Sequence, residues 1–343
     1  MNRYRVVQWA TGNIGTRSLR VVIDHPQLDL VGVYVYSDKK AGVDAGELCG
    51  APPTGVIATG DIDEIVALGA DCVLYMPRAC DFDDVCRLLE SGTNVVTTRG
   101  EFHRPGSMPA DVRARLEAGC VAGGTSIHST GSSPGFISEA LPLVLLSLER
   151  RVDCVTIDEF ADLSSRNSPE LLFDLMGFGR PPAPFEPGRA AYLQGSFGPS
   201  LELLADAVGL PLDGLESGGE LATARHTVDI AAGRLEAGTV GGQRITVTGL
   251  RNGQPLLRFR ATWYCTPDLD ADWDMRETGW RVTVEGDTPL AVDIRFPVDP
   301  ERWAEVSPGL TAHRAVNAVA AVCAAAPGIR TTLDLPHVVP VLS

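Results

Sequence analysis

The 343-residue sequence is 44% hydrophobic and 21% charged, which is typical of a globular protein large enough for two domains. Its formal net charge of −15 argues against nucleic acid and anionic membranes as partners. The eight cysteines occur without a C-x-x-C motif, and the six histidines lack metal-ligand spacing. Because no secretory signal and no bilayer-length apolar run are visible, we expect a cytoplasmic protein with free thiols and no metal.

The first stretch opens with an apolar run that ends at Trp9 and continues into a turn carrying Gly12 and Gly15. A helix is predicted over 16–23. A strand, a tight turn and a helix N-terminus in this order are typical of a pyrophosphate site, because backbone N–H groups and the helix dipole attract phosphate. The motif departs from G-x-G-x-x-G in having Ala10 at the first position, and a purely structural turn is the alternative. The residues expected to hold the dinucleotide here are Thr11, Gly12, Asn13, Ile14 and Gly15.

Strand and helix patterns then alternate up to residue 130. Buried strands are predicted over 28–36, 71–76, 93–98 and 125–130, and helices over 61–68, 81–91 and 109–119. This alternation predicts a Rossmann-type, doubly wound parallel sheet whose strand C-termini share one ligand-binding edge.

Beyond residue 130 the pattern changes to long alternating strands separated by turns. A helix is predicted over 136–148 and a half-buried strand over 152–160, followed by short helices over 169–176 and 201–208 and by strands over 223–231, 238–250, 255–265, 279–285 and 290–296. These strands predict an open, mostly antiparallel sheet. The Ala-rich stretch 311–325 is so apolar that we expect a buried helix that returns to the first domain.

The predicted fold class is therefore α/β followed by α+β. We expect a dinucleotide-binding domain over residues 1–130, completed by 308–343. A substrate-binding and dimerisation domain is expected over 131–307, since an open sheet face is a natural pairing surface.

The end of the second strand selects the coenzyme, because an acid there binds the ribose hydroxyls of NAD and basic residues bind the 2′-phosphate of NADP. The sequence at this point is Tyr36-Ser-Asp-Lys-Lys40. Ser37, Lys39 and Lys40 favour NADP, whereas Asp38 keeps NAD as a second option. A solvated surface turn is the alternative interpretation.

Glu101 is the strongest candidate for a catalytic group. It follows the strand predicted over 93–98, at the edge where ligands bind. A carboxylate there can accept a proton or stabilise a developing ammonium or iminium ion. An exposed loop glutamate is the alternative, and His103 is a second candidate.

The turn Gly131–Phe136 presents hydroxyl groups and a helix N-terminus at the domain junction. Ser132 and Pro134 are therefore expected to contact the nicotinamide end of the cofactor, although the turn could merely cap the helix. Large apolar side chains that could line a substrate pocket, or equally belong to a core, include Phe136, Phe160, Phe173 and Met176, with Phe178, Trp263 and Tyr264.

Five motifs together resemble a known family: the run Val6–Gly15, Tyr75-Met-Pro77, Thr97-Thr-Arg-Gly-Glu101, Ser133-Pro-Gly-Phe136 and the C-terminal stretch Asn317–Pro336. The sequence resembles actinobacterial proteins with a dihydrodipicolinate reductase-like N-terminal domain, a group that includes 2,4-diaminopentanoate dehydrogenase and the native amine dehydrogenases. The resemblance implies a dimeric NAD(P)-dependent enzyme that converts a small ketone or aldehyde and ammonia into a primary amine, and the reverse. It also implies that Glu101 is the catalytic glutamate. Further contacts expected along these motifs and the last helix are Met76, Pro77, Thr98 and Arg99 for the cofactor and Thr311 for the substrate pocket.

The sequence lacks the His-His pair, the lysine and the Gly-Thr anion site of true dihydrodipicolinate reductases, so a role in lysine biosynthesis is not expected. It also lacks the Glu-Lys-Pro motif of sugar oxidoreductases. Two alternatives stay open, namely an NAD(P)H-dependent carbonyl or imine reductase and a catalytically silent NADP-binding sensor.

Overall fold

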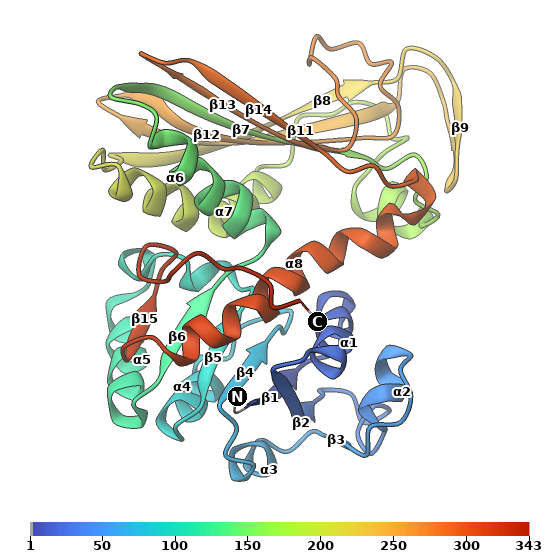
Figure 1. Ribbon diagram of the computed structural model, residues 1–343. Helices are drawn as coiled ribbons and strands as arrows, with labels where there is room; N and C mark the ends of the chain where they lie inside the picture. The colour runs from blue at the N-terminus through green and yellow to red at the C-terminus, as the bar shows by residue number, and fades with distance from the viewer. Residues whose placement is uncertain (1–2, 343) are drawn as a thin grey trace. The chain divides into compact units, whose positions relative to one another are not determined.

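The computed structural model describes residues 3–342 (Figure 1). The chain divides into two compact units. Met1–Phe136 and Val306–Ser343 form the first unit, and Ile137–Glu305 form the second.

A seven-stranded parallel sheet forms the centre of the first unit, and its strand order changes direction between β1 and β4. This doubly wound arrangement confirms the sequence prediction. In spatial order the strands are β15 (Gly328–Arg330), β6 (Ser126–Ser129), β5 (Asn94–Thr97), β4 (Cys72–Tyr75), β1 (Tyr4–Trp9), β2 (Leu28–Tyr34) and β3 (Ala58–Thr59).

Short helices connect these strands, and aspartate side chains start several of them. Asp81, for example, accepts hydrogen bonds from the N–H groups of Asp83 and Asp84, which satisfies two donors of the first turn of α4. The helical segments are α1 (Asn13–Asp24), α2 (Ala45–Cys49), α3 (Ile62–Ala67), α4 (Phe82–Glu90), η1 (Gly100–Phe102), η2 (Pro105–Ser107) and α5 (Ala110–Gly123).

The C-terminal segment also belongs to this unit. Helix α8 (Pro300–Cys323) packs its small apolar residues, including Ala315 and Val319, against Val6 and Leu74 of the sheet. The helix begins earlier than the predicted start at residue 311, because Pro308 and Gly309 weaken the helical pattern without ending the helix.

A six-stranded mixed sheet forms the second unit, in the order β14-β13-β7-β12-β11-β8. All its strand pairs are antiparallel except β7 with β12, so the prediction of a mostly antiparallel sheet is confirmed. The strands are β7 (Val152–Asp162), β8 (Gly214–Thr223), β11 (Val240–Arg251), β12 (Gln254–Tyr264), β13 (Gly279–Gly286) and β14 (Leu290–Arg295), with a separate hairpin of β9 (Val228–Ile230) and β10 (Gly233–Leu235).

Two strand predictions in this unit were wrong. The strand predicted over 223–231 does not exist as such, because β8 ends at Thr223 and the short β9 begins at Val228. Strand β7 is not half-buried but continuously buried from Cys154 to Asp158, where it lies in the interior of the sheet between β12 and β13.

Helix α7 (Pro187–Ala207) covers one face of this sheet together with α6 (Leu141–Leu146) (Figure 1). Phe197 of α7 stacks on Phe259 of β12, with ring centroids 3.7 Å apart. The predicted helix 201–208 is only the last part of α7, because three glycines and Pro199 obscure the helical pattern before it. The remaining helical segments are η3 (Ser132–Ala140), which is not helical at residues 133–135, and η4 (Glu170–Leu175).

No helix within residues 3–342 combines the length and apolar character needed to span a bilayer.

Candidate functional site

The candidate site lies at the C-terminal edge of the parallel sheet, within the first unit. Strands β1 and β4 are neighbours there, although their connections lead to opposite sides of the sheet. Such a change in strand order leaves a crevice in which doubly wound proteins bind their ligands. The turns that follow β1, β2, β4, β5 and β6 all reach this edge.

The turn between β1 and α1 fits a pyrophosphate. Ala10 has φ +70°, so it adopts the left-handed conformation usually left to glycine at this position. A Cβ on Gly15 would lie 2.1 Å from the carbonyl oxygen of Ala10, whereas a Cβ on Gly12 would meet nothing within 4 Å. Within residues 3–342 no side chain caps α1, and its first turn holds no acid, which leaves the N-terminal amides without a side-chain acceptor and suits an anion.

The residues expected at the adenosine ribose lie beyond β2, which ends at Tyr34. Ser37, Asp38 and Lys39 are exposed. Lys40 instead reaches back to the first turn, where its Nζ donates to the carbonyl oxygen of Thr11 at 2.8 Å and to its hydroxyl at 3.0 Å. Of the two predicted basic residues, Lys40 therefore contacts the turn after β1, whereas Lys39 is exposed.

The ends of β4 and β5 are joined by the hydroxyl of Thr97, which donates to the carbonyl oxygen of Tyr75 at 2.7 Å. Met76 and Pro77 are buried directly after β4, and Thr98 is partly buried directly after β5. This arrangement places the predicted residues of the two motifs side by side.

Glu101 lies on η1, one short turn beyond β5. The neighbouring Phe102 is fully buried and packs on Phe82, which anchors the turn. The Nη2 atom of Arg99 donates to Oε1 of Glu101 at 2.5 Å. Oε2 is buried and accepts no hydrogen bond from any group within residues 3–342, although 35% of the side chain is exposed. An acceptor of this kind is an unused binding position for an N–H donor.

His103, the second candidate, is buried, and its Nε2 lies 3.3 Å from the hydroxyl of Ser129. It therefore supports the loops behind Glu101. Cys80 lies near the carboxylate, and burial, followed by the negative charge of Glu101, raises the pKa of its thiol to about 12.

The segment after β6 contacts the C-terminal helix. The hydroxyls of Ser132 and Thr311 are 2.7 Å apart, and Arg314 donates to the hydroxyl of Thr130 at 3.1 Å. The guanidinium of Arg314 also lies 5.6 Å from the ring centre of Phe136. The hydroxyl of Ser133 is buried without a hydrogen-bond partner in the described part of the chain, which suits the amide group of a nicotinamide.

Sequence reasoning missed Arg314, and it named the hydroxyls of the turn Gly131–Phe136 as a group without singling out Ser133. Arg314 had one visible signal, because it is the single arginine within the apolar stretch 311–325. The burial of the Ser133 hydroxyl could not be read from the sequence, because it depends on the fold of the loop.

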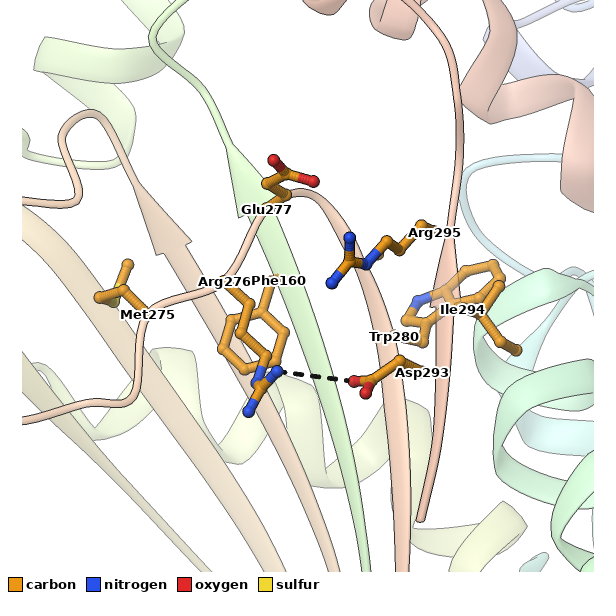
Figure 2. A pocket seen from close by; sticks show the side chains of 9 residues that line it. Phe160, Met275, Arg276, Glu277, Trp280, Asp293, Ile294 and Arg295 are labelled. Atoms are coloured by element: carbon orange, nitrogen blue, oxygen red, sulfur yellow. Dashed lines mark ion pairs between the residues drawn. The ribbon is translucent and has the colours of Figure 1, made fainter.

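The structure brings only some of the pocket residues predicted in the second unit together, and it separates Phe160 from Phe173 and Met176. Phe173 and Met176 pack around the buried side chains of Leu172 and Phe178. Phe160 lines a separate cavity of about 250 Å³ (Figure 2). Figure 2 also shows Arg276 in this cavity, paired with Asp293 at 3.8 Å.

Among residues 3–342, no group of three or more histidine, cysteine, aspartate or glutamate side chains could hold a metal ion.

The doubly wound sheet and the dinucleotide-type turn at its switch point fit an NAD(P)-dependent dehydrogenase, and the family match and the relatives place the chain in this class. More particularly, residues 136–342 match the model described as the 2,4-diaminopentanoate dehydrogenase C-terminal domain, and the chain belongs to this family. The resemblance drawn from the sequence motifs is thereby confirmed.

Relatives extend over nearly the whole chain. A curated amine dehydrogenase from Streptomyces virginiae is 29% identical over 346 residues, which cover 96% of this chain and 95% of the relative. The solved structure of an amine dehydrogenase from Mycobacterium smegmatis superposes with a TM-score of 0.71 at 21% identity, over 98% of this chain and 96% of that one. An oxidoreductase domain protein from Kribbella flavida superposes with a TM-score of 0.51 at 16% identity, over 94% and 90% of the two chains.

Proposed function

We propose that this protein is an amine dehydrogenase that reductively aminates small, mostly apolar ketones or aldehydes with ammonia and catalyses the reverse deamination. The observation that carries the proposal is the free Oε2 atom of Glu101 at the ligand-binding edge of the parallel sheet. A buried carboxylate oxygen without a donor suits a nitrogen that gains N–H bonds and positive charge during the reaction. Family membership and the amine dehydrogenase relatives support this choice of substrate.

In the proposed mechanism, Glu101 accepts a hydrogen bond from ammonia and orients it toward the carbonyl carbon. As the new C–N bond forms, Glu101 takes a proton from the nitrogen and passes it to the carbonyl oxygen, which gives the neutral carbinolamine. A second proton, supplied by ammonium or solvent, converts the hydroxyl into water, whose departure leaves the iminium. The resulting iminium is stabilised by the carboxylate. When bound, the reduced nicotinamide supplies the hydride that converts the iminium carbon into the amine carbon.

We propose NADP as the preferred coenzyme, with NAD as the second option. The helix N-terminus after Gly12 would hold the pyrophosphate, and Ser37 and Lys39 would contact the 2′-phosphate. In this proposal the first unit binds the dinucleotide, the second binds substrate and pairs two copies in a homodimer, and the protein acts in the cytoplasm.

Two alternative functions predict different results in an assay of NADPH oxidation. A carbonyl or imine reductase would not need ammonia, and a catalytically silent sensor would bind NADPH without turnover. The deciding experiment follows NADPH oxidation with a panel of small ketones and aldehydes, with and without ammonium, for the wild type, Glu101→Gln and Glu117→Gln. Glu117 is an exposed glutamate on α5 and serves as the matched control.

We expect oxidation that requires ammonium, falls at least about 100-fold in Glu101→Gln and persists in Glu117→Gln, since general acid–base groups contribute about 100-fold or more. Oxidation that is indifferent to ammonium would make the protein a carbonyl reductase. Binding of NADPH without oxidation of any substrate would favour the sensor.

A further inference from the structure

Arg99 contacts two loops of the site at once. Its Nη1 atom donates to the carbonyl oxygen of Arg78, beyond β4, at 2.7 Å. Its Nη2 atom donates to Oε1 of Glu101, beyond β5, at 2.5 Å. One planar guanidinium therefore connects the candidate catalytic carboxylate to the backbone of the neighbouring strand connection.

The backbone of Arg99 is fixed as well. Its N–H donates to the hydroxyl of Thr97 at 3.2 Å, and its carbonyl oxygen accepts from the hydroxyl of Ser129 at 2.7 Å. Thr97 ends β5 and Ser129 ends β6, so elements of three adjacent strands determine where the guanidinium lies. Such a side chain holds its partner in place more strictly than a surface arginine with one contact.

The contact divides the two oxygens of Glu101 between two roles. Oε1 is engaged by Arg99, and Oε2 accepts no hydrogen bond within residues 3–342. Because 35% of the side chain is exposed, packing alone does not fix the carboxylate. The ion pair supplies the constraint that keeps Oε2 available in one orientation.

We propose that Arg99 is a positioning residue for Glu101 and not a ligand of the cofactor. The sequence motif predicts the opposite, namely that Arg99 contacts the cofactor. This inference rests on the proposed function, in which Glu101 handles the protons of ammonia. An arginine suits the role because its planar fork reaches a carbonyl and a carboxylate at the same time. A lysine keeps the charge but offers no fixed pair of directions.

The kinetic test compares the wild type, Arg99→Ala, Arg99→Lys and Arg113→Ala in the ammonium-dependent assay. Arg113 lies on α5 and pairs with Glu117 at 3.8 Å, which makes it a control for loss of a surface arginine. We expect kcat to fall roughly 10- to 100-fold in Arg99→Ala and Arg99→Lys, while the Kd for NADPH stays within about twofold, because misplacing a reacting group costs this much. Arg113→Ala should retain wild-type kcat.

Chemical rescue separates positioning from a merely structural role. Guanidinium chloride at non-denaturing concentrations should restore part of the kcat of Arg99→Ala, whereas sodium chloride at equal ionic strength should not. A rise in the Kd for NADPH with unchanged kcat at saturation would overturn the proposal and make Arg99 a cofactor ligand. Lost activity that guanidinium fails to restore, in a variant that melts like the wild type, would also count against it.

The orientation of the Glu101 carboxylate can be measured without any turnover, so it tests the positioning role independently of the proposed reaction. Crystal structures of the wild type and Arg99→Ala should show Glu101 in one orientation in the wild type and in a different or divided orientation in the variant. An unchanged carboxylate in Arg99→Ala would refute the positioning role even if amination is never observed. Conversely, a displaced carboxylate in an enzyme without ammonium-dependent turnover would retain the positioning role and remove the proposed reaction.

Discussion

The ammonium group of Lys40 donates hydrogen bonds to both the carbonyl oxygen and the hydroxyl of Thr11, at 2.8 and 3.0 Å. The segment after β2 is thus attached to the turn after β1, and the cation lies beside the expected pyrophosphate position. Lys39, one residue earlier, is exposed and makes no such contact. Two adjacent lysines consequently have different expected effects on coenzyme binding.

Replacing these lysines separately tests that difference. Lys39→Ala should weaken NADPH binding about tenfold and leave NADH binding unchanged, because a single charge-assisted contact to phosphate is at stake. Lys40→Ala should weaken both coenzymes, because it loosens the turn that both share. Nicotinamide fluorescence titrations measure all four Kd values, and an equal loss of both coenzymes in Lys39→Ala would contradict the assignment.

The two glycines of the first turn should respond differently to alanine. Gly15→Ala forces a methyl group to 2.1 Å from the carbonyl oxygen of Ala10, so it should destabilise the fold by about 1–3 kcal/mol. Gly12→Ala meets open space and should fold normally, yet its methyl group projects at the helix N-terminus and should weaken NADPH binding. Thermal melts with and without NADPH separate the two effects, and normal NADPH stabilisation of Gly12→Ala would move the pyrophosphate away from this turn.

Buried thiols should make the fold sensitive to alkali. Burial raises the pKa of Cys120 to about 11 and that of Cys265 to about 12, above the ordinary value of 9.0. Above pH 9 the unfolded chain therefore loses these protons while the folded chain keeps them. The free energy of unfolding should decline by about 1.4 kcal/mol per pH unit for each cysteine, until pH reaches the folded-state pKa.

Urea unfolding at about pH 8 and about pH 10.5 measures this slope. The double variant Cys120→Ala/Cys265→Ala should be less stable than the wild type at neutral pH but should lose less stability as pH rises. Equal slopes for the two proteins would show that other groups cause the alkaline loss.

The parallel sheet could be predicted because its sequence carries local signals. Buried strands such as 71–76 are nearly continuous apolar runs, and aspartates such as Asp81 mark the helix starts between them. The position of Glu101 followed from the same logic, since parallel strands deliver the residues after them to one edge.

Other features depend on contacts that a single segment does not encode. The guanidinium of Arg99 meets Glu101 only because η1 turns the chain back within two residues and the carbonyl of Arg78 approaches from another strand. Phe160 and Phe173 are equally apolar in sequence, yet they lie in different environments because β7 and η4 pack on different neighbours. Tertiary packing overrides composition at these positions.

The return of α8 to the first unit has a consequence for biosynthesis. When the ribosome has made residues 1–136, the helix that covers Val6, Leu74 and Val96 does not yet exist. That face of the nascent sheet stays uncovered while Ile137–Glu305 are translated, and this second unit can fold first. The unit whose synthesis begins first is therefore the unit whose folding is completed last. Its uncovered apolar face is the surface that a chaperone would have to shield for the longest time during translation.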